Sequence, residues 1–267
     1  METMHVINLK RSKERWEHMT KEWQNDFQLE KYEAVDAKIK KIKGNQACKE
    51  SHLGLLKSLK SVVGKKYHIV CEDDIYKTKN FYEMWPEILE YIQTNNDWDI
   101  ISLDPFLNVD FCNIRSYNKT FNKIDIFRNL GFAIYSHDFI IKLDIDKYLK
   151  TWGIPDMTIA RNINFRKLTP KKLCVRQIEG VSERLGKNTN YRSSHNWDET
   201  EKELLEPTKN YLKYLNNFLG IFNNMDDSIF YCILILIMVM IVSLYFFHKE
   251  DISPYHIVEN IANISPS

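Results

Sequence analysis

The chain has 267 residues, of which 44% are hydrophobic and 13% aromatic, which is enough for one sizeable domain or two small ones and argues against disorder. Its 37 lysines and arginines nearly balance 36 aspartates and glutamates, and the net charge of +1 gives no bias toward nucleic acid. The five cysteines include no CxxC pair, so we expect ordinary reduced thiols rather than a disulfide framework or a zinc site.

Hydrophobic periodicity predicts alternating strands and helices over residues 4–177. Strands are expected at 4–9, 31–35, 67–71, 98–103, 132–135 and 173–177, and helices at 11–24, 45–63, 80–95 and 137–149. Asn45 and Ser136 are expected to cap the helices that follow them, while 38–45 is expected to be a loop and 105–130 irregular. This alternation predicts an α/β fold with a largely parallel central sheet and helices on both faces.

Residues 228–247, SIFYCILILIMVMIVSLYFF, carry no charge. A helix of this length spans about 30 Å, the thickness of the hydrocarbon layer. The alternative is a buried core helix, but such helices are seldom apolar around the whole circumference. The N-terminus lacks the apolar core of a signal peptide. We therefore expect a single-pass, C-terminal membrane anchor with the preceding domain in the cytosol.

The strongest local signal for chemistry is Glu72-Asp73-Asp74, directly after the predicted strand 67–71. Three consecutive carboxylates repel one another, and burying them costs free energy that a cation would offset. Residues two apart on an extended segment project to the same side, so Glu72 and Asp74 are expected to converge. Oxygen ligands suit Mn²⁺ or Mg²⁺. The alternative is an acidic turn in solvent.

Six short motifs occur in order between residues 4 and 186. They are Val6-Ile7-Asn8-Leu9 with Arg11 and Arg15, Ala34-Val35-Asp36-Ala37, Ala47-Cys48-Lys49-Glu50-Ser51-His52-Leu53-Gly54, Ile69-Val70-Cys71-Glu72-Asp73-Asp74, Leu130-Gly131-Phe132-Ala133-Ile134-Tyr135, and Gln177 with Ser182. In this order they resemble glycosyltransferase family 25, which includes bacterial lipooligosaccharide galactosyltransferases and procollagen galactosyltransferases. Phe132 and Glu183-Arg184 depart from the family pattern.

The resemblance implies a GT-A-type nucleotide-sugar-binding fold, a UDP-sugar donor and a divalent metal, Mn²⁺ or Mg²⁺, held by Glu72 and Asp74. It also implies a set of residues that contact the nucleotide sugar: Asn8, Leu9, Arg11, Arg15, Val35, Asp36, Ser51, His52, Asp73, Gly131 and Gln177. For several of these a structural role is the alternative: a solvated helix face for the two arginines, a turn for Asp36, and a satisfied structural pair for Ser51 and His52.

A catalytic carboxylate would deprotonate the acceptor hydroxyl as it attacks the anomeric carbon. The candidate base is Asp156, in Gly153-Ile154-Pro155-Asp156, with Asp104 as a rival; the alternative for Asp156 is a helix N-cap. If the family assignment holds, the sugar is transferred with inversion.

Taken together, the sequence predicts a catalytic domain at 1–197, a charged helical linker at 198–227, the transmembrane helix at 228–247 and a polar tail at 248–267. The expected function is transfer of galactose or glucose from a UDP-sugar to an acceptor hydroxyl. Lipid-linked glycan, lipopolysaccharide-like polymer, collagen-like protein and other protein acceptors stay open. Two other hypotheses are an inactive, membrane-tethered scaffold with the same fold and a metal-dependent phosphohydrolase.

Overall fold

A computed structural model describes most of the first 178 residues and two short strands after them. The described residues are 1–105, 114–125, 127, 129–151, 158–160, 162–178, 180–182 and 187–189. The chain divides into two units, Met1–Tyr211 and Leu212–Ser267, and every described residue lies in the first. The predicted linker helix and the segment 228–247 therefore lie outside the described residues.

An eight-stranded sheet forms the centre of the described part, in the order β2-β1-β3-β8-β5-β9-β7-β6. Its strands are β1 (Glu2–Asn8), β2 (Phe27–Glu33), β3 (Tyr67–Glu72), β5 (Ile100–Ser102), β6 (Ile114–Ser116), β7 (Phe121–Ile124), β8 (Phe132–Ser136) and β9 (Lys167–Pro170). β1 runs parallel to β2 and β3, and β5 runs parallel to β9. β8 and β7 run antiparallel to both of their neighbours. Only these two strands oppose the direction that the other six share, so the expected largely parallel α/β sheet is confirmed.

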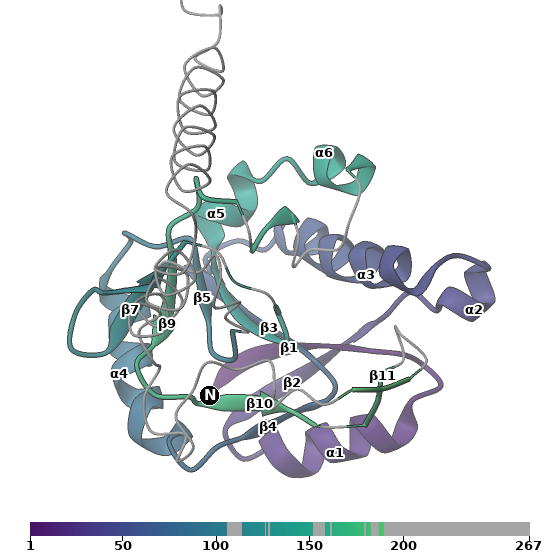
Figure 1. Cartoon of the computed structure of the whole chain (residues 1–267), viewed down its shortest axis with the longest axis horizontal. Coiled ribbons are helices and arrows are strands. Elements are labelled where there is room, and N and C mark those ends of the chain that lie inside the picture. The colour runs from purple at the N-terminus through teal and green to yellow at the C-terminus, as the bar shows by residue number, and fades with distance from the viewer. Residues whose placement is uncertain are drawn as a thin grey trace, which may run out of the picture. The chain divides into compact units, whose positions relative to one another are not determined.

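Helices cover both faces of this sheet, because each strand buries alternate residues on opposite sides. Along β3, Val70 packs into a core cluster with α3 (Gly44–Leu59) and α5 (His137–Lys142). Ile69 and Cys71 pack into a second cluster with α1 (Lys13–Trp23) and α4 (Phe81–Thr94). In Figure 1, α3 and α1 accordingly lie on opposite sides of the strands. Continuous apolar strands such as YHIVC are what a sheet buried on both faces requires.

Some element boundaries differ from the sequence predictions. β2 spans 27–33 rather than 31–35, because Phe27 anchors its buried start while most of this edge strand is polar and exposed. The predicted helix 45–63 starts at Gly44, with Lys43 rather than Asn45 at the N-cap position, and ends at Leu59. Val63 is 93% exposed beyond it. Ser136 does cap its helix by accepting a hydrogen bond from the Phe139 amide.

Other elements were missed or merged. The predicted loop 38–45 contains a one-turn helix, α2 (Ala37–Lys40), and the stretch predicted as irregular contains β6 and β7. β9 was not predicted at all. The predicted helix 137–149 is two helices, α5 and α6 (Ile145–Lys150), because Asp144 caps a new helix by accepting from the Lys147 amide.

Two short ribbons complete the described part. β4 (Ile75–Lys77) pairs antiparallel with β10 (Val175–Gln177), and β11 (Gly180–Ser182) pairs with β12 (Lys187–Thr189). The β4–β10 pairing brings the late part of the domain beside the acidic triplet. Among the described residues, no helix has both the length and the apolarity needed to cross a bilayer.

Candidate functional site

The acidic triplet lies at the carboxyl edge of the sheet, where two neighbouring parallel strands end. β1 ends at Asn8 and β3 ends at Glu72, which Asp73 and Asp74 follow. After β1 the chain forms β2, which lies on one side of β1 in the sheet, and then β3, which lies on the other side of β1. This is a topological switch point, the place where open α/β sheets bind ligands. Gly131 precedes the antiparallel strand β8, which brings it to the same edge.

Glu72 and Asp74 converge on one amide. The Nε2 atom of Gln177 donates to Glu72 Oε2 at 2.9 Å and to Asp74 Oδ1 at 3.2 Å. Gln177 reaches both because β10 pairs with β4 directly after the triplet. Burial, together with the charges of Glu72 and Asp73, raises the pKa of Asp74 to about 7 despite the opposing effect of Arg15. Two carboxylates thus share one neutral donor in a site where ionisation is costly.

Asp73 points to a different set of partners. Its Oδ2 accepts from Asn8 Nδ2 at 2.6 Å, and its Oδ1 accepts from Arg15 at 2.8 Å. Arg15, on α1, also donates to Asp74 Oδ2 at 3.3 Å. Burial raises the pKa of Asp73, while Arg15 and Asn8 act in the opposite direction. Asn8 is fully buried, and its Oδ1 has no hydrogen-bond partner within the described residues.

Asp104 supports the loop before β8. It is 0% exposed, and its carboxylate accepts from Asn129 Nδ2 at 2.7 Å and from the Phe132 amide at 3.1 Å. Burial raises the pKa of Asp104 well above its ordinary value. Asn129 adopts a positive φ of 81°, which asparagine tolerates better than most residues. Its Oδ1 accepts from the Gly131 amide, so the loop is fixed on both sides.

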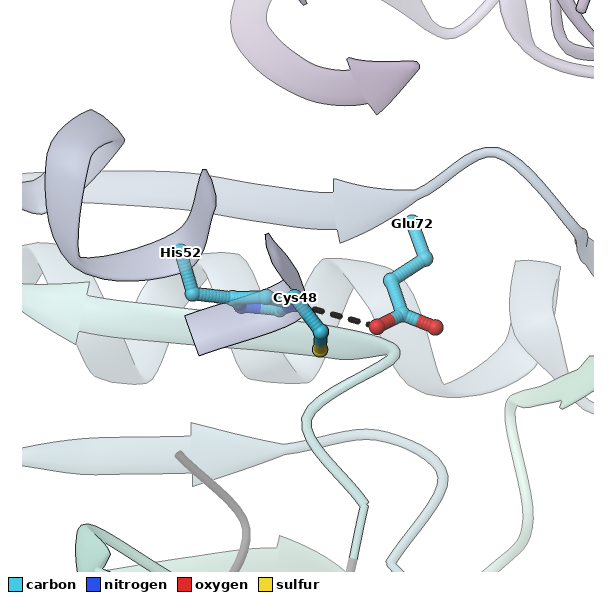
Figure 2. Close-up of side chains that lie close together, drawn as sticks. All are labelled: Cys48, His52 and Glu72. Carbon is cyan, nitrogen blue, oxygen red and sulfur yellow. Dashed lines mark hydrogen bonds and ion pairs between the residues drawn. The ribbon is translucent and has the colours of Figure 1, made fainter. Parts of the chain in front are cut away.

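His52 joins the site from α3, where it lies in the middle of the helix. Its Nε2 is 3.0 Å from Glu72 Oε1, and the ring is almost fully buried. Figure 2 shows Cys48, one helical turn earlier, beside the same ring and facing Glu72. Burial alone lowers the pKa of His52, but its hydrogen bonds to Cys48 and Glu72 raise it well above the ordinary value. Cys48 was not among the predicted site residues, although its i, i+4 spacing to His52 is visible in the sequence.

Two other predicted residues pair with each other outside the acidic triplet. Arg11 Nε donates to Asp36 Oδ2 at 2.7 Å. Asp36 also caps α2 by accepting from the Lys38 and Ile39 amides. The hydrogen bond from Arg11 lowers the pKa of Asp36. This pair fixes the chain after β2 and matches the turn role that the sequence left open for Asp36.

The remaining predicted residues act through the backbone or lie elsewhere. Ser51 Oγ accepts from the Val35 amide at 2.9 Å and donates to the Ala47 carbonyl at 2.7 Å, which is a structural pairing. The Leu9 carbonyl accepts from the Ser12 amide. Asp156 lies outside the described residues.

Neither a search of protein-family models nor a search of curated proteins found a match for the chain. Among solved structures, A197 from STIV is similar at a TM-score of 0.36 and 12% identity, covering 70% of this chain and 93% of that one. HddC from Yersinia pseudotuberculosis is similar at a TM-score of 0.32 and 11% identity, covering 67% of this chain and 73% of that one. Likenesses this distant do not indicate a function.

Proposed function

We propose that the chain is a metal-dependent glycosyltransferase related to family 25, which transfers galactose or glucose from a UDP-sugar to an acceptor hydroxyl. The observation that carries the proposal is the convergence of Glu72 and Asp74 on the single amide of Gln177 at the switch point of the sheet. Two motifs of the family resemblance supply these residues, and the fold brings them within hydrogen-bonding distance.

The residues present fit a hard divalent cation. Glu72 and Asp74 offer carboxylate oxygens, and burial and the charge of Glu72 disfavour the ionised form of Asp74 by raising its pKa. Mn²⁺ and Mg²⁺ prefer such oxygen donors. When bound, the cation would neutralise the charge that develops on the departing UDP. Gln177 would not contact the cation itself but would orient both carboxylates through its hydrogen bonds to them.

Asn8 and Arg15 would bind the nucleotide. Asn8 Oδ1 is a buried acceptor without a partner among the described residues, a state that usually costs free energy unless a ligand supplies the donor. A base N–H or a ribose hydroxyl would satisfy it. Arg15 spans Asp73 and Asp74, and its fork geometry also suits phosphate oxygens.

Asp156 and Asp104 were both predicted as the catalytic base. The buried, hydrogen-bonded Asp104 suits holding the loop of Gly131 better than reaching an acceptor. We therefore assign the base to Asp156 and a positioning role to Asp104. Asp156 would accept the proton of the acceptor hydroxyl.

We further propose that residues 228–247 anchor the enzyme to a membrane, because their 20 uncharged residues match the thickness of a bilayer. The catalytic domain would then face the cytosol and act on a glycan, lipid-linked or protein acceptor near that surface. An anchored enzyme meets membrane-bound acceptors at high effective concentration.

The test is UDP release by the full chain, purified in mild detergent, with UDP-galactose or UDP-glucose. Release is expected with Mn²⁺ and is expected to stop when EDTA is added. Asp74→Asn should lower the rate on the order of 100-fold or more, because it removes a charged ligand of the cation. Asp125→Asn is the matched control, since Asp125 pairs with Arg115 on the surface.

Three outcomes would contradict the proposal. Full activity of Asp74→Asn would contradict the assignment of Asp74 as a metal ligand. Absence of both UDP release and calorimetric binding for either donor would favour the inactive scaffold. Metal-dependent hydrolysis of simple phosphate esters without any need for a nucleotide sugar would favour the phosphohydrolase.

A further inference from the structure

Beside the oxygen-rich triplet, three side chains of different chemistry meet at one point. Cys48, His52 and Glu72 each offer one potential ligand atom, and the three atoms lie within 4.8 Å of one another. Cys48 and His52 are four residues apart on α3, which puts both on the same face of the helix. Glu72 reaches them from the end of β3, as Figure 2 shows.

This donor set differs from that of Glu72 and Asp74. A thiolate and an imidazole are poor ligands for Mn²⁺ or Mg²⁺ but good ones for Zn²⁺ and similar borderline cations. Zinc binds sulfur at about 2.3 Å and nitrogen or oxygen at about 2.0–2.2 Å, so tetrahedral ligands lie roughly 3.3–3.7 Å apart. The three atoms are therefore close enough to bind one ion after small side-chain rotations.

The surroundings also suit an ion. His52 Nε2 and Glu72 Oε1 already lie within hydrogen-bonding distance at 3.0 Å, so one cation could contact both atoms. Gln177 holds the other oxygen of Glu72, the kind of outer contact that orients metal ligands. The His52 side chain is only 4% exposed, but that of Glu72 is 29% exposed and Cys48 is half-buried, so an ion and a water ligand have access from one side.

We propose that Cys48, His52 and Glu72 form a binding site for a thiophilic divalent cation, for which zinc is the model ion. Binding would release the Cys48 thiol proton to solvent, and the His52 nitrogen that binds the ion would carry no proton. Cys48 Sγ, a ring nitrogen of His52 and a carboxylate oxygen of Glu72 would be the protein ligands, with water completing the tetrahedron.

Glu72 belongs to both groups of ligands, which gives the site a regulatory consequence that rests on the proposed function. Zinc would engage the Glu72 carboxylate that the Mn²⁺ site also needs. UDP release supported by Mn²⁺ should then fall as zinc is added, and Cys48→Ser should require about tenfold more zinc for the same inhibition. Inhibition that is equal in wild type and Cys48→Ser would overturn this consequence.

The binding test is a Co²⁺ titration of the full chain in a phosphine reductant, monitored by absorption. We expect one equivalent of Co²⁺ to give a thiolate-to-cobalt charge-transfer band in the near ultraviolet, which Zn²⁺ abolishes by displacement. Cys48→Ser and His52→Gln should each lose the band while keeping the wild-type circular dichroism. Cys174→Ala is the control, because this core cysteine is fully buried beside Lys172 and should leave the band unchanged.

A folded wild-type chain without the band, or a band that persists in Cys48→Ser, would overturn the proposal. Asp74→Asn separates this site from the proposed function. Asp74 is not a ligand here, so the variant should keep the cobalt band even though it loses UDP release. Full UDP release by Asp74→Asn would therefore contradict the proposed function alone, and loss of the cobalt band in this folded variant would contradict the zinc site alone.

Discussion

At the scale of single residues, Gly131 leaves almost no room for a side chain. A Cβ there would lie 2.9 Å from Asp104 Oδ2 and 3.1 Å from Gln177 Nε2. Both neighbours are buried and hydrogen bonded, so they cannot move without losing those contacts. We expect Gly131→Ala to destabilise the fold by about 1–3 kcal/mol and to weaken UDP binding, measured by urea unfolding and calorimetry.

Gly54 provides a matched control for this prediction. A Cβ at Gly54 would lie 2.6 Å from the Tyr32 hydroxyl, which is the far end of a flexible side chain. The helix α3 also gains from alanine, by up to about 1 kcal/mol. Gly54→Ala should therefore change stability little and leave UDP binding intact. Equal losses in both variants would show that the crowding around Gly131 has no special role.

At the scale of elements, α3 is tied to the chain after β2 through Ser51. Removing its hydroxyl leaves the Val35 amide without its acceptor. Ser51→Ala should cost about 1–2 kcal/mol and speed hydrogen exchange at Val35, measured by urea unfolding and amide exchange. Ser58→Ala is the control, because the Ser58 hydroxyl donates only to the Leu55 carbonyl of its own helix. A Ser51→Ala variant as stable as Ser58→Ala would contradict the prediction.

Elements with continuous apolar runs were the predictable ones. YHIVC and FAIY are strands because both of their faces are buried, and the stripe around Leu55 and Leu59 predicted α3. β9 carries Lys167, which is buried because its ammonium donates to the carbonyls of Ala160 and Asn162, so its pattern did not suggest a strand. β6 and β7 are short and mix apolar with polar residues. These elements form through pairing with neighbours, which local sequence does not reveal.

The residues of the candidate site could be named from the sequence, but the contacts between them could not. The triplet was singled out by its position after a buried strand and Gln177 by the family resemblance, and the fold brings them together. The Gln177 amide can bridge Glu72 and Asp74 because β4 pairs with β10, and no local sequence pattern indicates that pairing. Cys48 was interpreted as an ordinary thiol because the chain has no CxxC pair, and only the fold brings it close to Glu72.

At the scale of the whole molecule, a row of histidines links β1, β3 and the start of α5. His68 Nε2 is 3.0 Å from His137 Nδ1, and its ring lies 6.0 Å from that of His5. Burial, with His5, His137 and Lys65 nearby, lowers the pKa of His68 to about 4. Between pH 6.5 and 4 the unfolded chain is therefore protonated at His68 while the folded chain is not. The folded state consequently loses stability relative to the unfolded state as the pH falls through this range.

Thermal unfolding between pH 7 and 4 tests this. The midpoint of His68→Gln should fall less than that of the wild type, because glutamine cannot take up the proton. His18→Gln, whose parent ring contacts the Ile75 carbonyl rather than another histidine, should follow the wild type. If the unfolding midpoints of His68→Gln and the wild type fell equally with pH, protonation of His68 would not be the cause of the acid destabilisation.

The amide that bridges the acidic pair comes late in the chain. Gln177 follows Glu72 by 105 positions, whereas β1, β2 and β3 are all made before the triplet is finished. A ribosome translating this message therefore releases the carboxylates long before it releases the group that aligns them. A polypeptide interrupted before β10 would therefore carry the acidic triplet without the amide that bridges two of its carboxylates.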